Sequence, residues 1–213
     1  MIRIYEGTNF KLGCRTSRFK KDIEKEIEML DWDYLEWKKD PKKIEELHLQ
    51  IVQEYEIETV MSMDLWEYNI QEALKYADKL QKHTNRVLIP VHYYCKELLD
   101  YNIAYPNANW FKKNVFPPHE YRDNIKHILG GSPQSQIIHL TTDQLDVSDN
   151  SPLRFTKVES LDGNQFFNTA VRVGKEWFPN KPHWRNNGNN ISNSEKFTNS
   201  IKRFDNYTKE LGL

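Results

Sequence analysis

Acidic residues that follow apolar runs are the first candidates for chemistry in this chain. Asp31 and Asp33 flank Trp32, Asp64 ends the run that begins at Val60, and Asp162 precedes a Gly-Asn pair. Carboxylates serve as nucleophiles, as general acids or bases, and as oxygen ligands of cations. Because side chains alternate along an extended chain, Asp31 and Asp33 point to the same side, where they suit a cation or a shared proton.

Two further motifs stand at comparable positions. His92 follows an apolar run and is a candidate general acid or base, and Gly130-Gly131-Ser132 precedes Pro133. Two glycines let backbone N–H groups approach a phosphate or a base closely, and a helix dipole favours an anion there. Each motif also has a structural interpretation. The Gly130 to Pro133 segment suits a strand-to-helix turn with Ser132 as the cap.

Asp64 has a structural interpretation as well. Glu67 stands three residues after Asp64, as in a capping box at the start of a helix.

Zinc signatures are not found in the sequence. The seven histidines show no HExxH spacing, and Cys14 and Cys95 lie far apart, so neither a disulfide framework nor a Cys-based zinc site is predicted. No resident cofactor or metal is therefore predicted. The alternative is a divalent cation on oxygen-rich ligands, for which the candidates are Asp31, Asp33, Asp64, His92 and Asp162.

Short β-rich runs alternate with helical patterns, and these elements must position the candidate residues. Apolar residues at helical spacing predict helices over 44–55 and 66–80, with further stripes at 167–177 and 197–211. The predicted strands are Ile2 to Glu6, Glu26 to Leu30, Thr59 to Met63, Arg86 to Val91, Asn102 to Tyr105, His127 to Leu129 and Phe155 to Ser160.

This alternation predicts parallel strands with right-handed crossovers, either in a doubly wound sheet or in a (β/α) barrel. About seven strands in 213 residues favour an incomplete or reduced (β/α) barrel. In both folds the carboxyl ends of the strands face a common ligand site, where the candidate residues would meet. We expect one domain over 1–185, followed by an Asn-rich linker and a C-terminal helix over 186–213.

Composition narrows the partners and the compartment. Thirty Lys and Arg against 31 Asp and Glu give a net charge of −1, so no global positive field would hold nucleic acid or a membrane. The apolar runs, such as Val87 to Val91, are far shorter than the roughly 20 residues of a membrane span. The N-terminus lacks the apolar core of a signal peptide, which predicts a cytoplasmic protein.

Several motifs resemble an uncharacterised protein family of phages, archaeal viruses and prokaryotes. The resemblance runs from about residue 27 to 178, and its most specific stretches are LGGSPQ at 129–134 and DGN at 162–164. More distantly, the layout is similar to the tRNA-guanine transglycosylase superfamily, including its phage DNA-modifying branch, which uses a (β/α) barrel. The zinc cluster and the DSGGFQ pattern of the tRNA enzymes are not found in this sequence.

The resemblance implies an enzyme that acts on an N-glycosidic bond of a nucleotide or nucleic acid, by base exchange or base release. Asp64 or Asp162 would be the nucleophile, and His92 a general acid or base. The other site residues would bind substrate: Asp31, Asp33, Gly130, Gly131, Ser132, Gln134 and Asn164.

The implied partners are a nucleobase, a nucleotide or a nucleic acid, in a host cytoplasm if the protein is phage-encoded. One alternative is a metal-dependent hydrolase on the same barrel. The other is a noncatalytic protein in which the ring-rich loop 105–126 binds a nucleotide or a protein.

Overall fold

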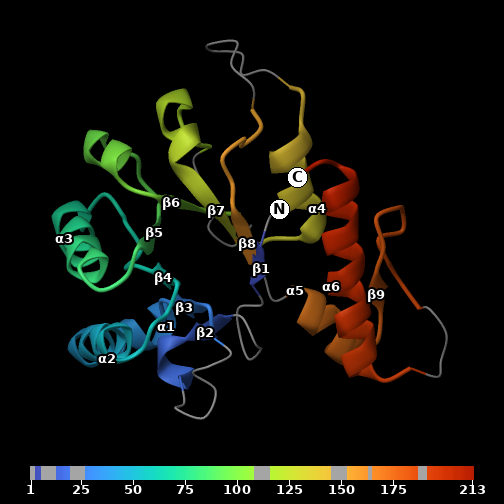
Figure 1. The fold of residues 1–213 in the computed structure, drawn as a ribbon, viewed down its shortest axis with the longest axis horizontal. Helices are drawn as coiled ribbons and strands as arrows, with labels where there is room; N and C mark the ends of the chain where they lie inside the picture. The colour runs from blue at the N-terminus through green and yellow to red at the C-terminus, as the bar shows by residue number, and fades with distance from the viewer. Residues whose placement is uncertain are drawn as a thin grey trace.

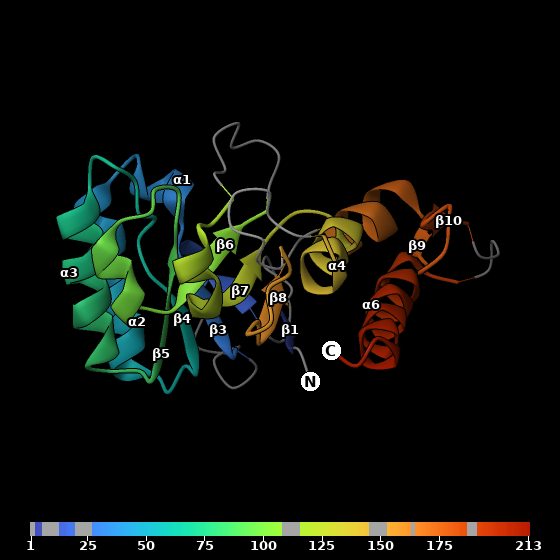
Figure 2. The same ribbon diagram turned by 90° about the horizontal axis from the view of Figure 1, so that it is seen from above.

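A computed structural model of the chain describes residues 3–5, 13–19, 27–107, 116–144, 153–162, 165–186 and 191–213. The described residues form a curled parallel sheet with helices packed against it and a smaller C-terminal lobe beside it (Figures 1 and 2). Gly163 and Asn164 lie outside the described residues, as do the middle of the ring-rich loop at 108–115 and the Asn-rich segment 187–190.

Eight parallel strands make up the sheet, in the order β1-β8-β7-β6-β5-β4-β3-β2. This is the cyclic order of an eightfold (β/α) barrel, and the described sheet opens between β1 and β2. The predicted class, an incomplete (β/α) barrel, is therefore confirmed. The strands are β1 Arg3–Tyr5, β2 Gly13–Arg15, β3 Met29–Asp31, β4 Thr59–Met61, β5 Arg86–Pro90, β6 Ile103–Pro106, β7 Ile125–Leu129 and β8 Ser160–Asp162.

Four helices occupy three of the connections between the described strands. In α2 and α3 the apolar residues recur at helical spacing, and this stripe is buried in each helix. Asp40 caps α2 by accepting a hydrogen bond from the backbone N–H of Lys43, and Pro41 occupies its first turn. The helices of this region are α1 Tyr34–Trp37, α2 Pro41–Glu54, α3 Ile70–Gln81 and α4 Pro133–Thr141, with short 3₁₀ segments at Thr16–Arg18, Lys96–Asp100 and His119–Asn124.

The C-terminal lobe packs around buried aromatic rings. Phe166, Trp177 and Phe204 meet edge to face, with ring centroids 5.2 to 6.2 Å apart. Ser192 caps the last helix in a capping box with Glu195. The elements of this lobe are α5 Gln165–Phe167, a π-helical turn at Asn168–Val173, the hairpin β9 Glu176–Trp177 with β10 Trp184–Arg185, and α6 Asn193–Glu210.

Several sequence-based predictions are corrected here. The last strand of the sheet is Ser160–Asp162, whereas the apolar residues of 155–159 precede it as irregular chain. Trp177 lies in β9 because the helical stripe breaks after the π-helical turn at Gly174, whose φ is +70°. Strand β2 was not predicted, because its residues, Gly-Cys-Arg, form no apolar run.

The helix that was predicted from Trp66 begins at Ile70, so Asp64 is not its cap. Among the helices in the described part of the chain, none has the length and apolarity that crossing a membrane requires.

Candidate active site

Four carboxylates stand at the carboxyl ends of the parallel strands, as the sequence predicted. Asp31 ends β3, Asp162 ends β8, and Asp33 and Asp64 follow β3 and β4 by two and three residues. We call these four residues the carboxylate mouth. Asp31 interacts electrostatically with the other three, so strands from both halves of the curled sheet contribute to one site.

Asp31 is the carboxylate whose proton is most strongly retained. Burial raises the pKa of its carboxyl well above the usual range, and the negative charge of Asp162 raises it further. Arg15, at the end of β2, opposes this shift with Nε 3.8 Å from Oδ2 of Asp31. Asp64 and Asp33 add smaller increases. A carboxyl whose environment favours the protonated form thus lies beside other acidic side chains, as a general acid beside a nucleophile requires.

The residues around Trp32 alternate as the extended backbone requires. The Trp32 ring packs between sheet and helices, 5.2 Å from the ring of His48 and 5.3 Å from that of Tyr76. Asp31 and Asp33 take the other side of the chain. Asp33 caps α1 by accepting from the backbone N–H of Glu36, and it also accepts a hydrogen bond from Ser17. Asp33 is therefore held by local structure.

Asp64 forms a pair with His92. Nε2 of His92 lies 3.0 Å from Oδ1 of Asp64, and the imidazole stacks on the ring of Trp66 with centroids 3.8 Å apart. Asn69 fixes the turn that carries Asp64, because its amide donates to the Asp64 carbonyl and accepts from the Trp66 N–H. The predicted site residues Asp64 and His92 are thus brought together in a geometry suited to proton transfer.

Asp162 is held by contacts to its carboxylate and to its backbone carbonyl. Its Oδ1 accepts from the backbone N–H of Gly130 at 2.6 Å and lies 3.3 Å from Nε2 of His127, a fully buried side chain. The amide of Gln136 donates to the carbonyls of both Gly130 and Asp162. The glycine turn and Asp162 therefore form one unit, in which the Gly130 N–H serves the carboxylate.

The orientation of the His127 ring follows from its neighbours. Oγ of Ser160 accepts from Arg86 Nη2 at 2.9 Å and lies 2.8 Å from Nδ1 of His127. These contacts leave Nε2 facing Oδ1 of Asp162 at 3.3 Å. When Ser160 donates its proton to Nδ1, a neutral His127 carries its own proton on Nε2, on the side of the carboxylate.

The turn after β7 has the capping structure that the sequence predicted. Ser132 caps α4 in a reciprocal pair with Ser135, and Pro133 is its first residue. Gly130 and Gly131 both have positive φ, at +70° and +82°. A Cβ at Gly131 would lie 2.5 Å from the side-chain nitrogen of Asn107, so close packing as well as backbone conformation requires glycine there.

The structure places Gln134 in the first turn of α4, next to the glycine turn. Its side-chain nitrogen is buried, and the described residues offer it no hydrogen-bond partner. A buried donor without a partner costs about 1–3 kcal/mol, which a ligand acceptor would recover. Asn164 lies outside the described residues.

Among the residues in the described ranges, no cluster of three or more His, Cys, Asp or Glu side chains has the geometry to hold a metal ion. The pairs at the mouth, Asp64 with His92 and Asp162 with His127, are each directed at one partner.

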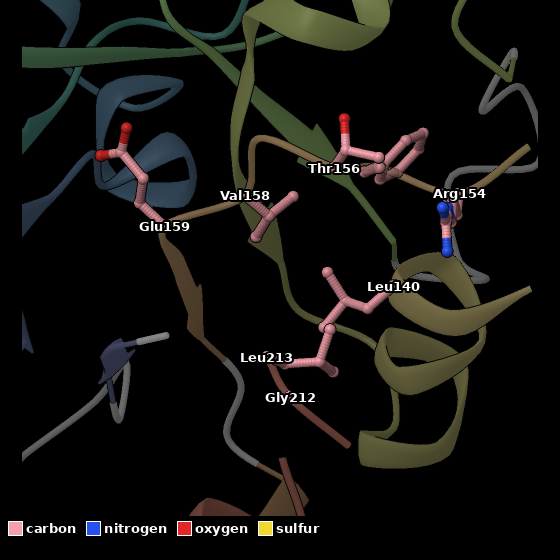
Figure 3. A pocket seen from close by; sticks show the side chains of 8 residues that line it. Leu140, Arg154, Thr156, Val158, Glu159, Gly212 and Leu213 are labelled. Carbon is pink, nitrogen blue, oxygen red and sulfur yellow. The ribbon is translucent and has the colours of Figure 1, made fainter. Parts of the chain in front are cut away.

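A separate pocket lies at the end of the sheet where β8 begins. Figure 3 shows Leu140 of α4 facing Leu213, with Arg154 and Glu159 at opposite rims. None of the predicted site residues lines it. The candidate carboxylates lie at the opposite, carboxyl end of the sheet.

Comparison with known proteins adds one relationship. A family model described as a family of unknown function (DUF6610) matches residues 6–209. The chain belongs to this family. No curated protein and no solved structure matches the chain. The site of this DUF6610 member must therefore be interpreted from its own geometry.

Several residues at the DUF6610 site were not singled out from the sequence. His127 and Gln136 hold Asp162, Arg15 faces Asp31, and Trp66 stacks on His92. His127 had a signal, because it stands two residues before Leu129 in a strand and so shares the inward face of the strand end. Arg15 had none, since its strand has only three residues.

Proposed function

We propose that this protein is an enzyme that breaks or exchanges an N-glycosidic bond of a nucleoside, nucleotide or nucleic acid at the carboxylate mouth. The observation that carries the proposal is the raised pKa of Asp31 beside Asp162 and Asp64. Glycosidic cleavage passes through an oxocarbenium-like state, which needs an acid for the leaving group and a carboxylate for the sugar carbon. Asp31, whose environment favours the protonated form, supplies the acid, and a neighbouring carboxylate supplies the group that meets the sugar carbon.

In the proposed reaction the carboxylate of Asp162 attacks the anomeric carbon. The bond from that carbon to the base nitrogen breaks, its electron pair stays on the nitrogen, and the base takes the proton of Asp31. Water or an incoming base then attacks the anomeric carbon and releases the Asp162 carboxylate. The Asp64–His92 pair accepts the proton of this second nucleophile, since the imidazole is held against its carboxylate.

The anchoring of Asp162 supports its assignment as nucleophile over Asp64. The Gly130 N–H donates to one carboxylate oxygen, His127 Nε2 lies 3.3 Å from the same oxygen, and Gln136 fixes the backbone that carries it. Positioning of this kind contributes most when a carboxylate must meet one carbon of a bound sugar. Asp64 is instead committed to His92.

The resemblance to the transglycosylase superfamily points the same way, and it extends the proposal to a cytoplasmic protein of a phage or mobile element. The buried side-chain nitrogen of Gln134 supports a role in reading the base, as that resemblance implies. The alternative metal-dependent hydrolase has less support, because its five candidate ligands divide into separate pairs and caps.

The test is release or exchange of a base by purified protein. Nucleosides, nucleotides and single-stranded oligonucleotides are incubated with and without EDTA, and free base is measured by chromatography. Asp162→Asn and Asp31→Asn should abolish release, whereas Asp143→Asn, at a side chain that is 96% exposed, should leave it unchanged. Full activity of Asp162→Asn would overturn the assignment. Loss of activity with EDTA would favour the hydrolase, and binding without turnover would favour the noncatalytic alternative.

A further inference from the structure

Beside the carboxylate mouth lies a group of aromatic side chains that the proposed chemistry does not use. Trp66 and Tyr68 come from the segment after β4, and Tyr34 from α1, which follows β3. His92, Trp66 and Tyr68 form a series of nearly parallel rings, at 7° between the first two and 8° between the last two. We call Tyr34, Trp66 and Tyr68 the aromatic ledge.

The series runs from the buried site to solvent. His92 is buried against Asp64, Trp66 is half-buried, and Tyr68 is 73% exposed. The negative charge of Asp64 acts on the Tyr68 hydroxyl, so the exposed ring stands close to the mouth. An aromatic ring of this exposure leaves a large apolar surface in water beside the catalytic groups.

Tyr68 also has polar and charged neighbours. Its phenol interacts electrostatically with that of Tyr34 and with Lys38. The ammonium of Lys38 lies 4.7 Å from the centre of the Tyr34 ring, a cation–π distance. The exposed ring is therefore part of a group of side chains, which lowers the entropy that it loses on binding.

From this arrangement we infer that the aromatic ledge binds the planar base of a purine nucleoside or nucleotide, which stacks on Tyr68 and continues the ring series. The inference rests on the proposed function, because it places the anomeric carbon of that ligand at the carboxylate mouth. Every planar base has a π face that stacks on such a ring.

The polar groups beside the ledge favour a base over a saccharide. Lys38 is a donor only, and the two phenol hydroxyls provide donors at the ring edge, which suit carbonyl and ring-nitrogen acceptors or a phosphate oxygen. Asp64 stands at the buried end of the ring series, where it pairs with His92. Sugar hydroxyls would donate to carboxylates there. The same negative charges oppose a long polyanion, so a single nucleoside or nucleotide is the expected ligand.

Binding is measured by calorimetry in the Asp162→Asn background, which separates binding from turnover. The probes are guanosine, adenosine, guanosine 5′-monophosphate, a single-stranded oligonucleotide and cellobiose. Tyr68→Ala should weaken purine binding at least about fivefold, the low end of what one base–aromatic stack contributes, and Tyr68→Phe should retain most of it. Tyr101→Ala, at the amino end of β6, is the matched control and should bind normally.

The outcomes distinguish this inference from the proposed function. Unchanged purine affinity in Tyr68→Ala, or binding of cellobiose alone, would contradict base binding by the aromatic ledge. Neither result bears on base release, which has its own assay. No purine binding at all would also overturn it. Tyr68-dependent purine binding without any base release by the unmodified protein would sustain the ledge and count against the enzyme. If guanosine 5′-monophosphate binds more strongly than guanosine, Lys38 contacts the phosphate. If the two bind equally, Lys38 contacts the edge of the base.

Discussion

Nε2 of His127 lies 3.3 Å from Oδ1 of Asp162, in the interior of the sheet. Because Ser160 contacts Nδ1 of the imidazole and itself accepts from Arg86, the ring cannot turn without breaking these hydrogen bonds. The carboxylate that ends β8 is thus positioned by a polar line that begins at Arg86 of β5, across the curled sheet. This line makes His127 a positioning residue for Asp162.

Replacing His127 tests that role. His127→Leu removes the donor and should lower base release about 100-fold, the effect of a misplaced reacting group. His127→Gln places an amide nitrogen near the position of Nε2 and should recover most of the loss. Rates of base release, with thermal melting as the check on folding, measure both variants. His83→Gln, at an exposed histidine that faces Gln53, is the control. Equal losses in the Leu and Gln variants would show that His127 only fills space.

The raised pKa of Asp31 predicts that its contribution to the free energy of unfolding falls as pH rises. Since burial raises the pKa of Asp31 in the folded state, the folded protein holds a proton that the unfolded chain loses above its ordinary pKa of about 4. The stability is fully present below that pH and is lost as pH rises toward the folded-state pKa.

Asp31→Asn should therefore raise the melting temperature at pH 8, by about 2–4 °C for each 1 kcal/mol gained, and change it little at pH 4. Scanning fluorimetry at the two pH values measures this difference. A uniform decrease at both would contradict the prediction.

The sequence predicted much of the fold because parallel strands and amphipathic helices carry strong local patterns. The buried stripe of α3, from Ala73 to Leu80, is visible as apolar residues at helical spacing, and the run at Arg86–Pro90 has the continuous apolarity of a central strand. Strand β2 has no apolar run, and the residues 155–159 that predicted the last strand precede β8. Their positions are set by neighbours in the sheet rather than by their own residues.

The site was predicted less completely, for a physical reason. Strand ends can be located from the sequence, so Asp31, Asp64, His92 and Asp162 were identified, and the structure places them at one end of the sheet. What each one contacts depends on side chains far away in the chain. Asp64 fits a capping box locally, yet its carboxylate meets His92, 28 residues further on. Such pairings carry no local signal.

The lowered pKa of His48 predicts the opposite pH dependence of stability from that of Asp31. Burial lowers the pKa of His48 to about 3, so the folded protein keeps it neutral while the unfolded chain takes up a proton below about 6.5. Stability is then lost as pH falls through this window, by about 1.4 kcal/mol per pH unit for the one proton.

His48→Asn retains a donor toward Thr16 and removes the titration, so its urea midpoint should fall less steeply than that of the unmodified protein between pH 6.5 and 4. Parallel pH profiles for the two proteins would contradict the assignment of the acid limb to His48.

Gly131 allows a matched test of the turn that carries Asp162. Gly131 and Gly212 have similar positive φ, at +82° and +73°, so alanine at either position pays about 1–2 kcal/mol for the left-handed backbone. At Gly131 the new Cβ would also lie 2.5 and 2.6 Å from Asn107 atoms, whereas Gly212 has open space around it. Overpacking adds about 1–3 kcal/mol, so Gly131→Ala should lose that much more stability than Gly212→Ala in urea unfolding.

The same displacement should reach the active site. Gly130 donates to Asp162, and Asn107 contacts both Ser135 and His139, so a shift at Gly131 moves the carboxylate relative to the mouth. Base release should fall in Gly131→Ala and stay unchanged in Gly212→Ala. If both variants melt and react alike, the glycine turn tolerates a side chain, and close packing against Asn107 is not what requires glycine at this position.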